Sequence, residues 1–285
     1  MRTVSLDELT IDDERSVRGV ALYDRLKQAL RRSDHRFQIP AAGARVSWDR
    51  ALFLNLTYWN GAHAADVLCD DHIPADVVAH VAWHQVVSRQ LARRQAGSSG
   101  SSGSSGAAPA APTAEALFFA ESIASAFDLY LVGRLLLIEP DSDFITTQVP
   151  LMAECAQEAG LPEGAFAALM QEVAGDPERA FEDLRALLLD AVNALFACAG
   201  AAEAQAALER LGGRRFAPLL HHYQLSNWIL YGRAYAAPAS GAGSGVRELD
   251  ATLRQAPVSV DWLAEHWIDA DLPAPAILTA NVDVR

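Results

Sequence analysis

The segment from Thr113 to Ile138 constrains the fold most, because it reads as one long helix of largely apolar side chains that begins at an N-cap threonine. Glu121, Ser125 and Asp128 interrupt it at spacings that place them on one face. An exposed face of this length would normally carry Lys, Arg or several Glu. A carboxylate among apolar side chains is costly unless it is paired or bound to a metal ion. We therefore expect this polar stripe to point inward.

A second helix is predicted from Pro74 to about Arg94, with Asp76 in its first turn. Its centre reads HVAWH, so His80 and His84 share one face and can direct both imidazoles at one divalent metal ion such as zinc. Asp76 lies one turn earlier on that face, either as a further ligand or as an acceptor that orients an imidazole. The histidine pair alone is a weak indication of metal binding, and Glu121 on the next helix strengthens it.

The rest of the chain predicts a mainly α fold with a small β portion. Further helices are expected at 13–32, 146–159, 163–174, 176–199, 214–236 and 258–269. Short strands are expected in HRFQIP, ARVSW and ALFLNLTYW, within 35–59, and the tail PAPAILTANVDVR reads as extended. We expect one domain that is built from residues 1–95 and 114–237, which are joined by a flexible Gly/Ser/Ala/Pro linker or loop at 96–113. A second flexible loop at 238–245 precedes a C-terminal helix and tail at 246–285.

Composition excludes several classes of function. The formal net charge of −13 over 285 residues argues against nucleic acid and anionic membrane surfaces as partners. No apolar run reaches about 18 residues and the N-terminus lacks an apolar signal segment, so we expect no membrane span and a cytoplasmic location. Cys69, Cys155 and Cys198 are widely spaced, which suits a reducing compartment and provides no CxxC metal motif. No GxGxxG, P-loop or GxSxG motif supports nucleotide binding or α/β-hydrolase chemistry.

The order of strand, histidine helix and acidic helix resembles the zincin metallopeptidases of the gluzincin branch. In that family one helix carries HExxH and a later helix supplies a glutamate as the third metal ligand. The resemblance covers residues 50–137 and implies a zincin-like helical domain in which His80, His84 and Glu121, within AESIASAFD, hold zinc or another divalent metal ion. Asp128 would then contact one of the metal-binding side chains without binding the metal ion itself, although the family's usual residue in that role lies nearer its glutamate.

One departure from the family decides the expected chemistry. The glutamate after the first histidine is the family's general base, and Val81 stands at that place. Loss of such a group typically lowers the rate about 100- to 10,000-fold. The resemblance therefore implies a protein without ordinary peptidase activity, which acts on a protein or peptide partner as a binding or regulatory protein, or has altered chemistry. Asp76, Asp128 and His222 are candidates for another base, and none lies in a matching motif.

The segment HHYQLSNWILYGRAY is a further candidate region. His221 and His222 point about 100° apart on a helix and cannot easily face one metal ion. His222, Tyr223 or Tyr231 could stand where the family places a late His or Tyr that steadies the oxyanion, although core packing is the simpler interpretation. The cluster Asp70-Asp71-His72 is interpreted as a helix-entry loop, and His35, His63 and His266 as structural.

Two other classes of protein remain open. A helical bundle can hold iron or a di-metal pair for oxygen chemistry, with Asp76, His80, His84, Glu121 and Asp128 as ligands. The absence of any Glu-x-x-His motif argues against that class. Alternatively, the chain is a metal-free helical interaction domain, whose mark would be a Glu121 hydrogen-bonded to serine or backbone groups.

Overall fold

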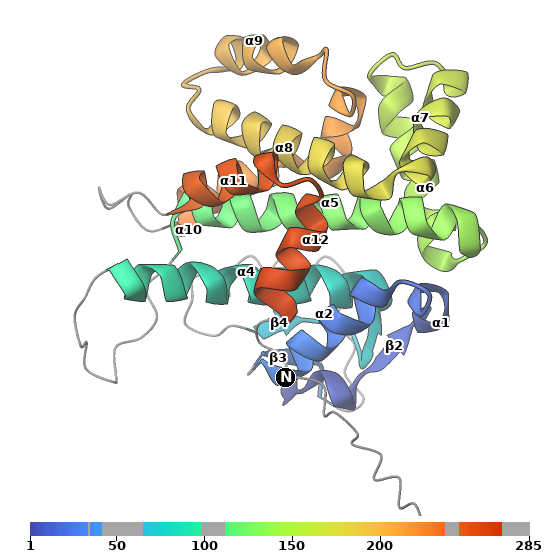
Figure 1. Ribbon diagram of the computed structural model, residues 1–285, viewed down its shortest axis with the longest axis vertical. Helices are drawn as coiled ribbons and strands as arrows, with labels where there is room; N and C mark the ends of the chain where they lie inside the picture. The colour runs from blue at the N-terminus through green and yellow to red at the C-terminus, as the bar shows by residue number, and fades with distance from the viewer. Residues whose placement is uncertain (34, 42–64, 99–111, 237–244, 270–285) are drawn as a thin grey trace, which may run out of the picture.

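The central element of the fold is helix α5 (Ala114–Ile138). The computed structural model describes residues 1–33, 35–41, 65–98, 112–236 and 245–269. Helix α4 (Ala75–Ser98) packs on one side of α5 and helix α8 (Pro177–Phe196) on the other (Figure 1). Helix α2 (Ala21–Arg32) and the short strands lie beyond α4 (Figure 1). The predicted mainly α fold with a small β portion is confirmed.

Helix α5 is central because nearly all of its sides are apolar. Its start is as predicted, since the Thr113 side chain accepts a hydrogen bond of 3.3 Å from the backbone N–H of Ala116. Gly133 allows α7 (Glu163–Gly175) to approach closely, because a Cβ there would lie 2.7 Å from the backbone oxygen of Val173. α5 is long and apolar enough to cross a membrane, but 83% of its most apolar window is buried inside the molecule, as in the core helix of a bundle.

Within the described residues, the β portion consists of two small sheets. In the first, β1 (Arg2–Val4) pairs antiparallel with β3 (Arg36–Ile39), which pairs parallel with β4 (Ala65–Val67). In the second, β2 (Thr10–Asp12) is parallel to β5 (His72–Pro74). β5 leads directly into α4, so this sheet anchors the first turn of the histidine helix.

The sequence predicted only part of these strands. HRFQIP forms β3 as expected, whereas ARVSW, ALFLNLTYW and the tail PAPAILTANVDVR lie outside the described residues. The prediction of a simple loop before α4 was wrong for His72, which begins β5. The ring of His72 contacts Asp12 at 2.8 Å across the β2–β5 pair, which gives this residue a structural role.

The remaining helical elements complete the bundle. They are η1 (Leu6–Glu8), α1 (Glu14–Val17), α6 (Asp143–Glu158), α9 (Ala201–Leu211), the 3-10 segment η2 (Ala217–Tyr223), α10 (Leu225–Tyr235), α11 (Val246–Gln255), α12 (Ser259–Leu263) and the π turn η3 (Ala264–Ile268). α4 continues to Ser98, three residues into the predicted linker, and residues 99–111 of that linker lie outside the described part of the chain.

Two predicted helices are divided in the structure. Residues 13–32 form α1 and α2, because the chain turns near Gly19 so that Val17 and Val20 both enter the core. Residues 214–236 form η2 and α10, because Gln224 adopts a left-handed conformation with a φ of 48°. Helix α9 was not predicted, since Ala207 is its one buried hydrophobic residue and its apolar pattern is correspondingly weak.

Candidate metal centre

Helix α4 presents the two histidines to α5. Its other faces are occupied by buried apolar residues, among them Val78, Ala82 and Trp83, which pack into the core. His80 and His84 are spaced by one turn, and their ring centroids lie 5.0 Å apart. Their side chains are 30% and 20% exposed, so both rings are largely shielded from solvent, and His80 lines a pocket.

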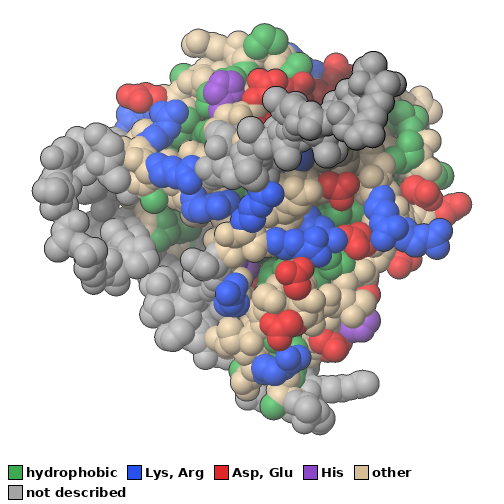
Figure 2. Space-filling model, turned by 60° about the horizontal axis from the view of Figure 1, so that its bottom comes forward, with side chains coloured by type: hydrophobic (Ala, Val, Ile, Leu, Met, Phe, Trp, Pro, Cys, Tyr) green, Lys and Arg blue, Asp and Glu red, His purple; other side chains and the backbone are tan. Residues whose placement is uncertain are grey.

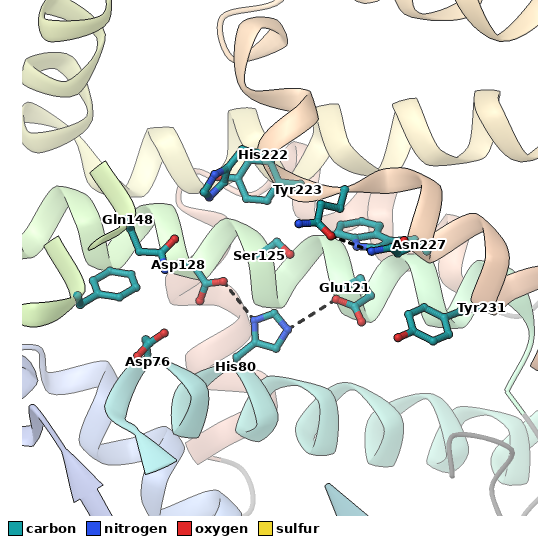
Figure 3. A pocket seen from close by; sticks show the side chains of 13 residues that line it. Asp76, His80, Glu121, Ser125, Asp128, Gln148, His222, Tyr223, Asn227 and Tyr231 are labelled. Atoms are coloured by element: carbon teal, nitrogen blue, oxygen red, sulfur yellow. Dashed lines mark hydrogen bonds and ion pairs between the residues drawn. The ribbon is translucent and has the colours of Figure 1, made fainter. Parts of the chain in front are cut away.

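Helix α5 supplies the facing carboxylates. The Glu121 side chain is 15% exposed and Ser125 is buried, and both line a pocket with Asp128. The predicted inward polar stripe is therefore confirmed. Figure 3 shows Glu121 and Asp128 on either side of the His80 ring, each joined to it by a dashed line.

His80, His84 and Glu121 form a group that could hold a metal ion. Each offers one ligand atom, and these atoms lie within 4.8 Å of one another. His80 Nε2 is 3.6 Å from Glu121 Oε2, and His84 Nε2 is 3.5 Å from Glu121 Oε1. Two ligand atoms bound tetrahedrally to a metal ion at about 2.0–2.1 Å are roughly 3.4 Å apart. Each of the two separations, one to each oxygen of Glu121, is close to that spacing, so the group could hold a metal ion. Among the described residues this is the one group of three with such geometry.

Asp128 contacts the ring nitrogen of His80 that faces away from Glu121. Its Oδ2 lies 3.2 Å from His80 Nδ1. A carboxylate in this position accepts a hydrogen bond from Nδ1–H. The proton then stays on Nδ1, and Nε2 offers its lone pair to a metal ion. The other oxygen, Asp128 Oδ1, is buried and has no hydrogen-bond partner among the described residues.

The electrostatics of the group favour charge pairing between histidines and carboxylates. Burial disfavours protonated His80, but Asp128 and Glu121 outweigh burial and raise the pKa of His80 well above its ordinary value. Burial would raise the pKa of Glu121, but His84 and His80 hold it well below its ordinary value. Burial, followed by the charge of Asp128, raises the pKa of Asp76 to about 6.

A pocket of about 280 Å³ opens beside the histidine His80. Its walls come from four parts of the chain, namely α4, α5, α6 and the η2–α10 region. The lining residues are Asp76, His80, Glu121, Ser125, Asp128, Phe144, Gln148, His222, Tyr223, Gln224, Asn227, Trp228 and Tyr231 (Figure 3). The structure thus brings Asp76, Asp128 and His222, the three predicted candidates for a base, to one cavity.

Several pocket residues were missed or undervalued by sequence analysis. His222, Tyr223 and Tyr231 were interpreted chiefly as packing residues, yet all three line the pocket. Gln148 and Asn227 were not singled out at all. A signal existed for Asn227, since Gln224, Asn227 and Tyr231 follow helical spacing, and the Asn227 amide donates a 2.8 Å hydrogen bond to the Gln224 side chain.

Other predicted residues lie away from the pocket. His221 lines a separate, mostly apolar cavity of about 570 Å³, as expected from its different direction from His222. His35 pairs with Asp66 at 2.9 Å, and His266 Nδ1 lies 2.8 Å from the Trp262 carbonyl oxygen, which supports structural roles. His63 lies outside the described residues. The three cysteines are unpaired by disulfides.

Val81 directly follows His80, at the position where the predicted gluzincin resemblance would require a general base. Its side chain is 7% exposed and belongs to the hydrophobic core. It is not among the residues that line the pocket. A carboxylate at this position would be buried among apolar side chains, so the structure provides no polar setting for the family's base at position 81.

Comparison of the chain with protein-family models, curated proteins and solved structures finds no match. The resemblance to gluzincins therefore stays a prediction from the sequence motif. The described residues themselves establish a His-His-Glu group that could hold a metal ion, next to a pocket that could admit a small molecule.

Proposed function

We propose that the protein binds one divalent metal ion, zinc, through His80 Nε2, His84 Nε2 and one oxygen of Glu121. The observation that carries this proposal is the convergence of the three side chains from two helices, with histidine–glutamate separations of 3.5 and 3.6 Å. The separation from His80 runs to Glu121 Oε2 and that from His84 to Oε1, and each is close to the ligand spacing of a tetrahedral site. Asp128 orients the His80 ring by accepting a hydrogen bond from Nδ1–H.

Two imidazoles and one carboxylate are the donor set of many catalytic zinc sites. Such a site leaves a position for water or a ligand, and zinc there supplies Lewis acidity. In this chain the position would face the pocket, which His80 and Glu121 both line. Asp76 and His222 line the same pocket and are the groups able to hold or accept a proton near a bound ligand.

We further propose that the protein is a zincin-like binding or regulatory protein, or an enzyme of altered chemistry, without ordinary peptidase activity. Val81 cannot accept a proton, and its burial in the core supports this proposal. A pocket of about 280 Å³ lies just below the usual range for drug-sized ligands, which favours a small molecule or the end of a chain as the ligand.

The test is elemental mass spectrometry of the purified protein beside His84→Ala and Glu121→Gln variants. We expect about one zinc ion per chain in the wild type and loss of that zinc in both variants. His221→Ala is the matched control, because His221 is exposed and lines the other cavity; it should keep the zinc.

Two other results would replace this proposal. Iron at about two ions per chain would favour a di-metal oxidase in which Asp76 and Asp128 are additional ligands. No metal in the wild type, together with a fold unchanged by chelator, would favour a metal-free interaction domain.

A further inference from the structure

The pocket beside the metal centre carries an excess of negative charge. Asp76, Glu121 and Asp128 line it, and none of the described lining residues is Lys or Arg. Metal binding requires the neutral form of His80 and His84. In the metal-bound protein a divalent ion would therefore balance two of the three carboxylates and leave one negative charge facing the cavity. A buried carboxylate without a partner is costly, so this charge calls for a cation from outside the chain.

We propose that this pocket binds an organic ammonium ion, that is, a small molecule with a protonated amine held between Asp76 and Asp128. This deepens the proposed function, since it rests on the metal site for the charge balance and assigns a class of ligand to the same pocket. The molecule's remaining atoms would extend from the amine toward Glu121 and the metal position.

The positions of the two carboxylates support this ligand. Asp76 from α4 and Asp128 from α5 lie at the same end of the pocket, with Gln148 and His222, whereas Glu121, Asn227 and Tyr231 lie toward the other end (Figure 3). An ammonium group donates up to three hydrogen bonds, and two carboxylates on different helices can accept them from different directions.

Two polar atoms in this pocket lack partners. Asp128 Oδ1 and Tyr223 Oη are both buried, and neither has a hydrogen-bond partner among the described residues. Tyr223 is only 8% exposed although its side chain lines the pocket. Buried polar atoms are normally satisfied. The carboxylate oxygen of Asp128 can only accept and the Tyr223 hydroxyl can also accept, so both are compatible with a ligand that carries donor groups.

The aromatic lining also favours a cation. Phe144, Tyr223, Trp228 and Tyr231 all line the pocket, and the first three are less than 9% exposed. Aromatic faces attract ammonium groups, and the attraction increases when water is excluded. In the metal-bound protein, by contrast, a phosphate or carboxylate would meet no Lys or Arg among the described lining residues and would depend on the metal ion as its positive partner.

The experiment is isothermal titration calorimetry of the zinc-loaded protein with n-butylammonium chloride and with n-butanol, its neutral counterpart of similar shape. We expect butylammonium to bind at least about tenfold more tightly than butanol. Asp76 is not one of the three proposed metal-binding residues, and Asp76→Asn keeps the side-chain shape while it removes one negative charge. This variant should weaken butylammonium binding at least about tenfold. Glu163→Gln, an exposed position on α7, is the control and should bind butylammonium like the wild type.

Zinc content measured on the same samples separates this inference from the proposed function. Equal affinity for the two compounds, no binding of either, or an Asp76→Asn variant that binds butylammonium normally would overturn the ammonium site, whatever the zinc content. Butylammonium binding that depends on Asp76 in a protein without zinc would support the ammonium site and contradict the proposed metal centre.

Discussion

Two clusters of charged side chains in the described part of the chain can be compared, because they differ in how completely their members pair with one another. The arginine cluster consists of Arg185 on α8, Glu182 one turn before it, and Asp250 on α11. The metal-site cluster consists of His80, His84, Glu121 and Asp128 on α4 and α5. Arg185 is fully buried and donates hydrogen bonds of 2.7 and 2.8 Å to Glu182 and 2.8 Å to Asp250.

The members of the metal-site cluster lie further apart than those of the arginine cluster. Its histidine–glutamate separations are 3.5 and 3.6 Å, Asp128 Oδ1 has no hydrogen-bond partner among the described residues, and a pocket adjoins it. Direct, short contacts close the arginine cluster, so it holds α11 against α8. The spacing in the metal-site cluster leaves room for an ion. The comparison separates a charge cluster that is closed by direct contacts from one whose spacing could hold a metal ion.

The largest expected effect comes from breaking the arginine cluster. Arg185→Ala should lower the free energy of unfolding by about 3–5 kcal/mol, because it leaves the partly buried Glu182 without its partner and Asp250 with Arg254 alone. Arg179→Ala is the control, since Arg179 is 68% exposed in its pair with Asp183 and should cost less than about 1 kcal/mol. Urea unfolding measures both variants, and similar costs would mean that the arginine cluster is no stronger than a surface pair.

The next largest effect on stability is expected when zinc binds in the metal-site cluster. Zinc at about 100 times its dissociation constant should raise the free energy of unfolding of the wild type by about 2.7 kcal/mol. Glu121→Gln should gain little, because it lacks the anionic ligand. Urea unfolding with zinc and with chelator provides the comparison. An equal gain in the variant would show that zinc stabilises the protein at another site.

A smaller effect is expected from the carboxylate that positions His80. Asp128→Asn should weaken zinc binding roughly 10- to 100-fold while one zinc ion still binds per chain, because Asn is a weaker acceptor for His80 Nδ1–H. Competition with a chromophoric chelator measures the affinity. Ser125→Ala, one turn away on the same stripe, is the control. Loss of zinc stoichiometry in Asp128→Asn would instead make Asp128 a direct ligand.

The smallest effect concerns Asp76 and pH in the metal-free protein. Folding raises the pKa of Asp76 from 3.8 to about 6, so the folded state holds this proton more tightly and loses stability as pH rises from about 4 to about 6. The whole shift corresponds to about 3 kcal/mol. Asp76 is only partly buried, and solvent screening reduces this figure, so Asp76→Asn should be more stable than the wild type by about 1–2 kcal/mol at pH 8. The difference should nearly vanish at pH 4. Thermal or urea unfolding at both pH values tests this, and a difference that does not change with pH would refute it.

Sequence patterns predicted well those features that depend on neighbours along the chain. Helical spacing correctly grouped His80 with His84 and Glu121 with Asp128, and Thr113 was correctly assigned as the cap of α5. The break at Gln224 escaped prediction, because a left-handed residue between two helical segments has no strong local signal unless it is Gly or Asn.

By itself, the sequence determined which side chains share a helix face, because the 3.6-residue period is a property of the local backbone. Only the tertiary structure decided which faces meet. The packing of α4 against α5 brings His80 to Glu121, and η2 with α10, about 100 residues further along the chain, closes the pocket with His222 and Tyr223. Such contacts depend on how whole apolar faces fit together in the core, which no short stretch of sequence encodes.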